Sequence, residues 1–441
     1  MARELEISVN ERLLGYLRES NGLWELEYEA DWAGATDAFD LSPALPRSRR
    51  VHADGASLRP VQWYFDNLLP EEALRSALAK EARVPAEDAF GMLAYFGAES
   101  AGSLVLRDRE RPAAAERGLK PLPLSELSRR IADLPQASLG EKAPKKMSLA
   151  GAQHKLPIVL DGDQLFEPLP GTPSTHILKP NHLLGDRYPA SVMNEYFTMR
   201  LASAAGLVVP NTRRIYAPQP VYIVERFDRI RGDSPDDTRR LHIIDTCQLL
   251  NKAPAYKYTA AHLDALAQAV ALCREKALAR QQLYRWLAFN IIAGNADNHL
   301  KNISFLVDAS GIHLAPAYDL LSTAVYDTRA MADERAVWPE VALTIPLERA
   351  NTFAAVVRAD VVAAGRVLGL AEATAQRLLD ALLATVPAAA ARLIAEIEAG
   401  SVRDTEASPA AKAAGAQIPG EVRMLRAIHR IVIREMAERL A

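Results

Sequence analysis

The 441-residue chain contains only two cysteines, Cys247 and Cys273, so neither a disulfide framework nor a cysteine-based zinc site is expected. Its 52 basic and 55 acidic residues give a formal net charge of −3, which leaves no basic excess for binding nucleic acid over a large surface. No apolar run approaches transmembrane length, and the first residues are too charged for a signal peptide. We therefore expect a cytoplasmic protein with no membrane partner.

Two common catalytic motifs are also missing. The chain has no Gly-x-x-x-x-Gly-Lys-Ser/Thr sequence, which argues against a Walker A phosphate loop. It has no Gly-x-Ser-x-Gly elbow either, which argues against a charge-relay hydrolase. Any phosphate chemistry must therefore use a different set of residues.

The pattern of hydrophobic residues predicts an α+β protein. Residues 5–9 and 24–28 alternate apolar and polar side chains as half-buried strands do, and 156–160, 175–179 and 221–224 also suggest strands. Helices are predicted at 70–78 and 191–205. From about residue 241 onward the pattern is helical, with segments at 260–279, 281–293, 359–369, 371–385, 388–398 and 420–440 and a tether at 401–418.

This order predicts three regions: a β-rich domain at 1–110, a strand-rich lobe at 111–230, and an all-helical lobe at 231–441. A strand-rich lobe followed by a helical lobe is a kinase-like layout, with nucleotide expected between the lobes.

The helical region contains the most informative motif of the chain. Asp297 precedes Asn302 by five positions, and a second acid, Asp319, follows. Kinases use this order: one carboxylate orients the attacking hydroxyl, and an amide oxygen and a second carboxylate hold magnesium. Each residue alone has a simpler interpretation, as a cap or a turn residue.

The strand-rich region contains residues that suit nucleotide phosphates and adenine. Lys179 ends a predicted strand, and Glu195 lies on the following helix, an arrangement that matches the Lys–Glu pair of kinases. Glu225, Arg226 and Phe227 follow another apolar strand and suit an adenine-binding hinge. For each of these residues, a solvated charge or a strand end is the simpler interpretation when it is taken alone.

The segment from Ser148 to Lys155 contains small residues that allow backbone N–H groups to approach phosphates. Taken alone, the segment is better explained as an ordinary turn. For the nearby Lys142, Lys145 and Lys146, a solvated basic run is favoured over phosphate binding.

Together these motifs resemble the HipA family of serine/threonine kinase toxins, over roughly residues 1–350. The resemblance implies a two-lobe kinase-like fold that uses ATP and Mg2+, with Asp297 as the catalytic residue and Asn302 and Asp319 as metal ligands. It implies an ATP site made of Ala150, Gly151, Ala152, Gln153, His154, Lys155, Lys179, Glu225, Arg226, Phe227, His299, Leu300, Lys301, Asn302, Tyr318 and Asp319.

The same resemblance implies autophosphorylation at Ser148. It also implies a partner, a HipB-like helix-turn-helix antitoxin. Only through this antitoxin would the chain bind operator DNA and repress its operon. The protein substrate in the family is glutamyl-tRNA synthetase, whose phosphorylation arrests translation and promotes persistence. His154 departs from the family pattern, which has an acid there.

Two alternatives remain at this point. One is a small-molecule or lipid kinase with the same lobes, although no basic amphipathic stretch suits a membrane surface. The other is a catalytically silent co-repressor that only binds the antitoxin, which the presence of Asp297, Asn302 and Asp319 disfavours.

Overall fold

The computed structural model describes residues 3–108, 116–147, 149–151, 153–234, 237–407 and 418–441, with residues 400–407 described by their backbone alone. Its contacts divide the chain into two compact units. The first unit comprises 1–179, 225–257 and 304–315, and the second comprises 180–224, 258–303 and 316–441. Each unit is therefore assembled from three separate stretches of sequence. The three-region division expected from the sequence stays a prediction.

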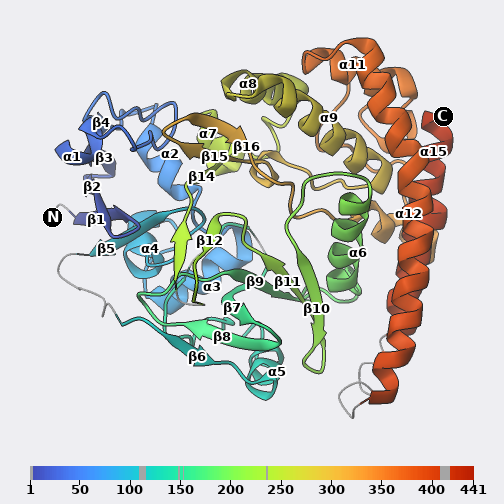
Figure 1. Ribbon diagram of the computed structural model, residues 1–441, viewed down its shortest axis with the longest axis horizontal. Helices are drawn as coiled ribbons and strands as arrows, with labels where there is room; N and C mark the ends of the chain where they lie inside the picture. Colours follow the sequence, from blue (N-terminus) through green and yellow to red (C-terminus); the bar gives the residue numbers. More distant parts are fainter. Residues whose placement is uncertain (1–2, 109–115, 148, 152, 235–236, 408–417) are drawn as a thin grey trace. The chain divides into compact units, whose positions relative to one another are not determined.

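The first unit begins with a five-stranded antiparallel sheet in the order β4-β3-β2-β1-β5 (Figure 1). Its strands are β1 (Arg3–Val9), β2 (Arg12–Ser20), β3 (Leu23–Tyr28), β4 (Val51–Ala53) and β5 (Leu104–Asp108). The alternation that predicts strands at 5–9 and 24–28 is confirmed, because Leu5, Ile7 and Val9 all lie in the core. Gly15 is required in β2, since a Cβ there would stand 2.0 Å from the backbone oxygen of Glu27 on β3.

Four helices accompany this sheet in the first part of the chain. They are α1 (Ala30–Gly34), α2 (Pro60–Asp66), α3 (Glu72–Ala82) and α4 (Ala89–Phe96). The helix predicted at 70–78 is confirmed as α3, which begins after Glu71. Trp24 of the sheet packs edge-on against Phe90 of α4, with ring centroids 5.2 Å apart.

A second group of strands in the first unit places the predicted phosphate segment. Strands β6 (Leu119–Pro121), β8 (Gln164–Pro168), β7 (Leu156–Asp161) and β9 (His176–Pro180) lie side by side and antiparallel, and helix α5 (Leu124–Ala132) precedes them. A hairpin, β12 (Arg229–Arg231) and β13 (Thr238–Arg240), also belongs to this unit. The strands predicted at 156–160 and 175–179 are confirmed.

The expectation of helices alone from residue 241 onward misses a small sheet. Strands β14 (Ile243–Asp245), β15 (Ser304–Asp308) and β16 (Gly311–Leu314) pair in sequence order, next to the short helices α7 (Thr246–Leu249) and η1 (Pro254–Tyr256). These strands have only three to five residues. A segment this short does not show enough alternation of apolar and polar residues to be recognised as a strand. It becomes a strand because it pairs with segments far away in the sequence.

The second unit contains most of the long helices (Figure 1). They are α6 (Ser191–Ala204), α8 (Leu263–Leu272), α9 (Lys276–Ala293), α11 (Arg358–Val367), α12 (Glu372–Ala407), α14 (Ile418–Ala427) and α15 (Arg434–Leu440). Its shorter elements are the hairpin β10 (Thr212–Tyr216) and β11 (Pro220–Glu225), α10 (Arg329–Ala332), the 3-10 helices η2 (Leu300–Asn302), η3 (Thr323–Asp327), η4 (Asp333–Arg335) and η5 (Phe353–Ala355), and a π-helical turn η6 (Ile428–Ile433).

The two helices predicted at 371–385 and 388–398 are one. Pro387 lies inside α12 without ending it, although proline removes a helical hydrogen bond. Val386 and Ala390 are completely buried on either side of Pro387, and α12 packs on α6, α9 and α11 of the same unit. Tertiary packing therefore outweighs the local cost. Of the tether expected at 401–418, residues 401–407 continue α12 and 408–417 lie outside the described residues.

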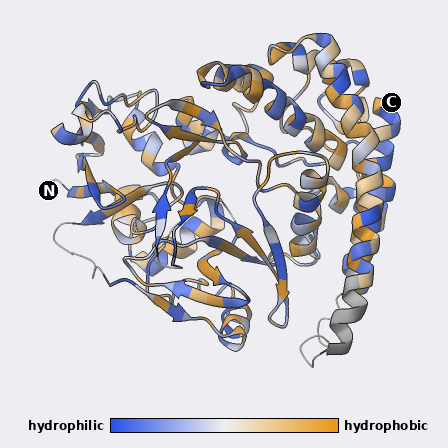
Figure 2. Cartoon of the chain, viewed as in Figure 1, coloured by the Kyte–Doolittle hydropathy of each residue, from blue (hydrophilic) through white to orange (hydrophobic). Residues whose placement is uncertain are grey.

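The stretch Glu372–Ala399 of α12 is long and apolar enough to cross a membrane, by length and composition only. The expectation that no apolar run approaches transmembrane length is therefore wrong for this helix. Figure 2 shows hydrophilic and hydrophobic residues mixed along this helix. Its apolar residues Leu379, Leu382 and Leu393 are at most 3% exposed in the second unit. A core helix of a folded unit passes the same test of length and composition, so this helix alone is weak evidence for a span.

Candidate active site

The turn that carries the catalytic motif is positioned by the end of α9. Gly294 caps this helix in the left-handed conformation, with φ of +66°. A Cβ at Gly294 would lie 2.4 Å from a methyl carbon of Val432, so only glycine fits. Beyond it, the Asn295 amide donates to the side-chain oxygen of Asn290 at 2.7 Å. The chain is therefore redirected sharply and held by buried polar contacts directly before Asp297.

Asp297 is held through its backbone and through its carboxylate within the second unit. The backbone N–H of Asp297 donates to the Asn295 side-chain oxygen at 2.9 Å, and the Tyr258 hydroxyl donates to Oδ1 of Asp297 at 2.7 Å. The Tyr258 ring also stands edge-on to His299, with centroids 4.9 Å apart. Sequence reasoning missed Tyr258, because 39 residues separate it from Asp297 and no local pattern connects them.

Asn302 is oriented by the same turn. Its Nδ2 donates to the backbone oxygen of Asp297 at 2.7 Å, so its Oδ1 is the atom available to a cation. Residues 300–302 form a single 3-10 turn, and the Tyr318 hydroxyl donates to the backbone oxygen of Lys301 at 2.7 Å. The structure thus connects the Asp297 turn directly to the segment that contains Asp319.

Asp319 adopts a left-handed backbone conformation, with φ of +57°, which is uncommon outside glycine and frequent at functional sites. Its carboxylate and that of Glu195 both act electrostatically on the Tyr222 phenol. Burial raises the pKa of Tyr222 well above its ordinary value, and the negative charges of Glu195 and Asp319 raise it further. The structure therefore places the α6 glutamate in the same region as the predicted metal ligand.

These donors suit magnesium. Mg2+ takes oxygen ligands and is commonly bound by one or two protein groups together with phosphate oxygens. The oriented Oδ1 of Asn302 and the carboxylate of Asp319 are ligands of this kind. In the described part of the chain, no three His, Cys, Asp or Glu side chains gather as a metal cluster.

The remaining predicted site residues belong to the first unit. Lys179 lies near the end of β9 and is buried. Glu225 and Phe227 are half-buried at the end of β11 and just beyond it. Because Lys179 and Glu195 belong to different units, their pairing stays a prediction.

Arg226, predicted to bind ATP, has its side chain committed elsewhere. It is 4% exposed, and its guanidinium donates to Asp228 at 2.7 Å and to Glu99 at 3.1 Å. Its backbone N–H donates to the oxygen of Thr175. Glu99 is wholly buried and receives ion pairs from Lys145, Arg226, Arg229 and Arg240. Burial opposes ionisation, but these cations, Arg240 foremost, hold the pKa of Glu99 well below its usual range.

The predicted phosphate segment is described at 149–151 and 153–155, while Ser148 and Ala152 lie outside the described residues. Gly151 has φ of +108°, a conformation that favours glycine. A Cβ there would stand 2.7 Å from the Lys155 ammonium, which donates to the backbone oxygen of Ala150 at 2.6 Å. His154 is buried and Gln153 half-buried. Within the described residues, the Lys155 side chain therefore bonds back to Ala150 and closes this segment.

The solvated basic run expected near this segment is wrong for one member. Lys142 is exposed and Lys146 half-buried, but Lys145 is fully buried. Its ammonium donates to Glu99 at 2.6 Å and to the oxygen of Thr172 at 2.9 Å. The carboxylate that compensates the buried charge belongs to Glu99, 46 residues earlier in the chain. The sequence around Lys145 therefore gives no indication that this lysine is buried.

The fold and the arrangement of Asp297, Asn302 and Asp319 define a kinase-like α+β protein of two units. Comparison with known proteins agrees. The family models "HipA N-terminal domain" and "HipA-like C-terminal domain" match residues 5–107 and 147–390. The chain therefore belongs to the HipA family.

Individual relatives extend this match. The Y4mE protein of Sinorhizobium fredii, provisionally named a kinase, is 35% identical over 74% of this chain and 78% of its own length. The serine/threonine-protein kinase toxin HipA of Shewanella oneidensis is 29% identical over 73% of this chain and 76% of its own. The structure of the Shewanella oneidensis HipA, HipB and operator DNA complex superposes with a TM-score of 0.74 and 25% identity, covering 98% of this chain and 99% of that one.

Proposed function

We propose that this protein is an ATP- and Mg2+-dependent serine/threonine protein kinase and the toxin component of a toxin–antitoxin pair. The observation that carries the proposal is the joint orientation of Asp297 and Asn302. Asn302 turns its amide N–H toward the Asp297 carbonyl and so leaves an oxygen for the cation, while Tyr258 and Asn295 hold Asp297. A silent binding protein would not need this arrangement.

In this proposal each residue has one role. Asp297 accepts or orients the proton of the attacking hydroxyl, and Asn302 and Asp319 hold Mg2+. Lys179 and the turn at 150–155 hold ATP phosphates, with Glu225–Phe227 at the adenine and His299–Asn302 and Tyr318 beside the nucleotide. Because the Arg226 side chain is occupied by Glu99 and Asp228, we assign that residue no side-chain contact with ATP. When bound, Mg2+ supplies positive charge that offsets the charge of the transferring phosphoryl group.

The test of kinase activity uses purified protein, ATP with a labelled γ-phosphate, Mg2+ and either a cell lysate depleted of small molecules or the small-molecule fraction. Label in protein supports the proposal. Label only in small molecules favours the alternative of a small-molecule kinase, and no label in either fraction favours the silent co-repressor. The Asp297→Asn variant, run in parallel, controls for a contaminating kinase.

The finer parts of the proposal concern the acceptor and the partner. We propose that the protein phosphorylates its own Ser148 and a cellular protein, with an aminoacyl-tRNA synthetase as the first substrate to test. Mass spectrometry of protein made in cells, with Ser148→Ala as control, tests autophosphorylation. The partner would be a HipB-like helix-turn-helix antitoxin that brings the chain to operator DNA and represses the operon, because the solved relative is a complex with HipB and its operator. A cytoplasmic location goes with this role.

A further inference from the structure

The predicted phosphate segment, of which residues 149–151 and 153–155 are described, is called the phosphate turn below. It is held by residues that belong to the N-terminal part of the first unit. Three separate contacts connect Lys145, Lys146 and the described residues 149–151 to helix α3, to the segment before it, and to the loop after α4. None of these contacts involves the residues assigned to the chemical step. The turn therefore packs against the N-terminal region, which corresponds to the HipA N-terminal domain matched at residues 5–107.

The first contact is a buried ion pair. Lys145 and Glu99 are both 0% exposed, and their charged atoms are 2.6 Å apart. Burial lowers the pKa of Lys145 to about 8, although Glu99 opposes this. A buried charge left alone is strongly unfavourable, so this pair cannot separate without disrupting the Glu99 cluster. It fixes the start of the turn.

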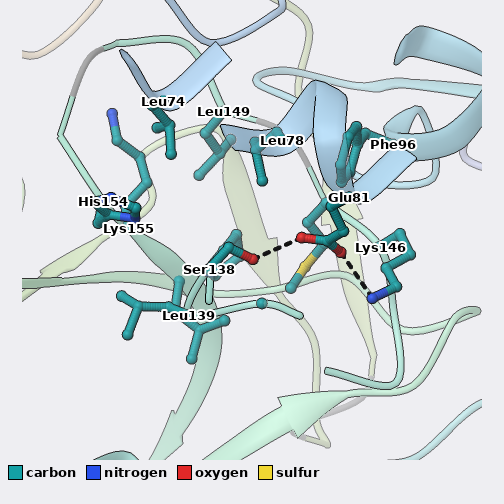
Figure 3. A pocket seen from close by; sticks show the side chains of 14 residues that line it. Leu74, Leu78, Glu81, Phe96, Ser138, Leu139, Lys146, Leu149, His154 and Lys155 are labelled. Atoms are coloured by element: carbon teal, nitrogen blue, oxygen red, sulfur yellow. Dashed lines mark hydrogen bonds and ion pairs between the residues drawn. The ribbon is translucent and has the colours of Figure 1, made fainter. Parts of the chain in front are cut away.

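The second contact is a half-exposed ion pair on α3. Glu81 accepts from the Lys146 ammonium at 2.9 Å and from the Ser138 hydroxyl at 2.7 Å, as Figure 3 shows. The Glu81 side chain is 12% exposed and that of Lys146 is 30% exposed. Water can reach this pair, so it can open at much lower cost than the pair of Lys145 and Glu99.

The third contact lies on the turn itself. Gly151 forms a parallel β-bridge with Pro70, and the Glu71 N–H points to the Gly151 oxygen at 3.4 Å. Leu149 is 7% exposed and lies beside Leu74 and Leu78 of α3 (Figure 3). A cavity of about 30 Å³ remains between α3 and the turn, enough for a water molecule. The seat of the turn is therefore packed less tightly than a core.

We propose that the N-terminal region acts as a clamp on the phosphate turn, with Glu81 and Lys146 as its releasable latch and Glu99 and Lys145 as its fixed anchor. Glu81 and Lys146 are positioning residues. The latch keeps Leu149 against α3 and Gly151 against Pro70, and opening it frees the turn while Lys145 stays in place. The consequence for ATP rests on the proposed function, because it requires that the turn bind phosphate.

Hydrogen exchange followed by mass spectrometry tests the clamp on the full chain. Glu81→Gln should increase exchange in peptides covering 146–155 by roughly two- to fivefold, the range for one partly exposed ion pair. Lys146→Met should do the same or more, because the Lys146 ammonium also donates to the backbone oxygen of Glu141 at 2.6 Å. The double variant should add little to Lys146→Met, which already removes the shared ion pair. If Glu81→Gln folds poorly, Lys146→Met carries the test, since Lys146 is the more exposed partner.

The matched control is Glu19→Gln. Glu19 also has a side chain 12% exposed and accepts an ion pair, from Arg3 at 2.9 Å, but it lies on β2. This change should leave exchange at 146–155 as in the wild type. Equal exchange in wild type and in both latch variants would overturn the clamp, and so would an increase that Glu19→Gln reproduces.

ATP affinity, measured by calorimetry on the same variants, separates the clamp from the proposed function. Faster exchange with ATP affinity lowered by a similar factor supports both. Faster exchange with unchanged ATP affinity supports the clamp and removes the turn from the ATP site. Because exchange is measured without ATP, failure of the kinase assignment does not affect the first result.

Discussion

The side-chain amide of Asn302 donates a hydrogen bond of 2.7 Å to the backbone carbonyl of Asp297. This contact joins the proposed proton acceptor to the proposed metal ligand, so a shift of one shifts the other. It also decides which atom of the amide faces a cation, since the N–H is used within the turn. Substitutions at Asn302 and at Asp297 therefore test the two proposed roles in turn.

Asn302→Asp keeps an oxygen for Mg2+ but replaces the N–H donor with an oxygen that repels the Asp297 carbonyl. We expect kcat to fall by roughly 10- to 100-fold, the scale of a misplaced catalytic group, while the affinity for Mg2+ is not weakened. Rates at saturating Mg2+ and ATP, together with a magnesium titration, measure both. An unchanged kcat would show that this hydrogen bond does not position Asp297.

Asp297→Asn removes the carboxylate and preserves its size. Because a positioned base contributes about 10²- to 10⁴-fold, phosphoryl transfer should fall by that factor while ATP binding persists. Transfer and ATP affinity are measured on the same folded sample, with circular dichroism as the control for folding. Transfer at the wild-type rate would remove Asp297 from the mechanism.

Tyr258→Phe removes the hydroxyl that donates to Asp297 at 2.7 Å and keeps the ring against His299. The expected loss in kcat is roughly three- to tenfold, the effect of one hydrogen bond, with little change in ATP affinity. Tyr256→Phe is the matched control, because Tyr256 is a nearby tyrosine that is 53% exposed. A loss of the same size in both variants would contradict a specific role for Tyr258.

The free energy of unfolding should depend on pH through His242. Burial lowers the pKa of His242 from 6.5 to about 4, so the unfolded chain binds a proton between these values that the folded chain does not. Stability is therefore lost as pH falls below about 6.5. The loss through this group at pH 5 is about 2 kcal/mol.

Urea unfolding at pH 7 and pH 5 measures this effect. His242 contacts Tyr64, Ser103 and the Leu41 carbonyl, so His242→Gln will lower stability at both pH values. The difference between the two pH values should nevertheless shrink by about the same 2 kcal/mol. If the free energy of unfolding of the variant still differs between pH 7 and pH 5 as much as in the wild type, the pH dependence belongs to other groups.

Operator DNA should bind the chain only through its antitoxin. The net charge of −3 gives no general attraction to phosphates. A gel shift at physiological salt should show no specific complex with the chain alone and a larger complex when a HipB-like partner is added. Tight sequence-specific binding by the purified chain alone would overturn this expectation.

Sequence alone determined the local features of this protein. Alternation of apolar residues predicted β1 and β3, because side chains of a strand point alternately to two faces, and apolar segments suggested β7 and β9. Helices were predicted at 191–205 and 281–293, and in the structure a glycine in the left-handed conformation, Gly206 or Gly294, follows each of them. The spacing of Asp297 and Asn302 within one turn identified the candidate chemistry, because both residues are carried by a single short segment.

Tertiary structure alone decided the features that depend on distant partners. Lys145 lies in a basic segment yet is buried, because Glu99 compensates its charge, and the guanidinium of Arg226 is buried against the same carboxylate. Pro387 does not end α12, because burial of its neighbours outweighs a lost hydrogen bond. Tyr258 reaches Asp297 only once the chain has folded. In each case the deciding energy comes from contacts between residues far apart in sequence, and no local pattern records them.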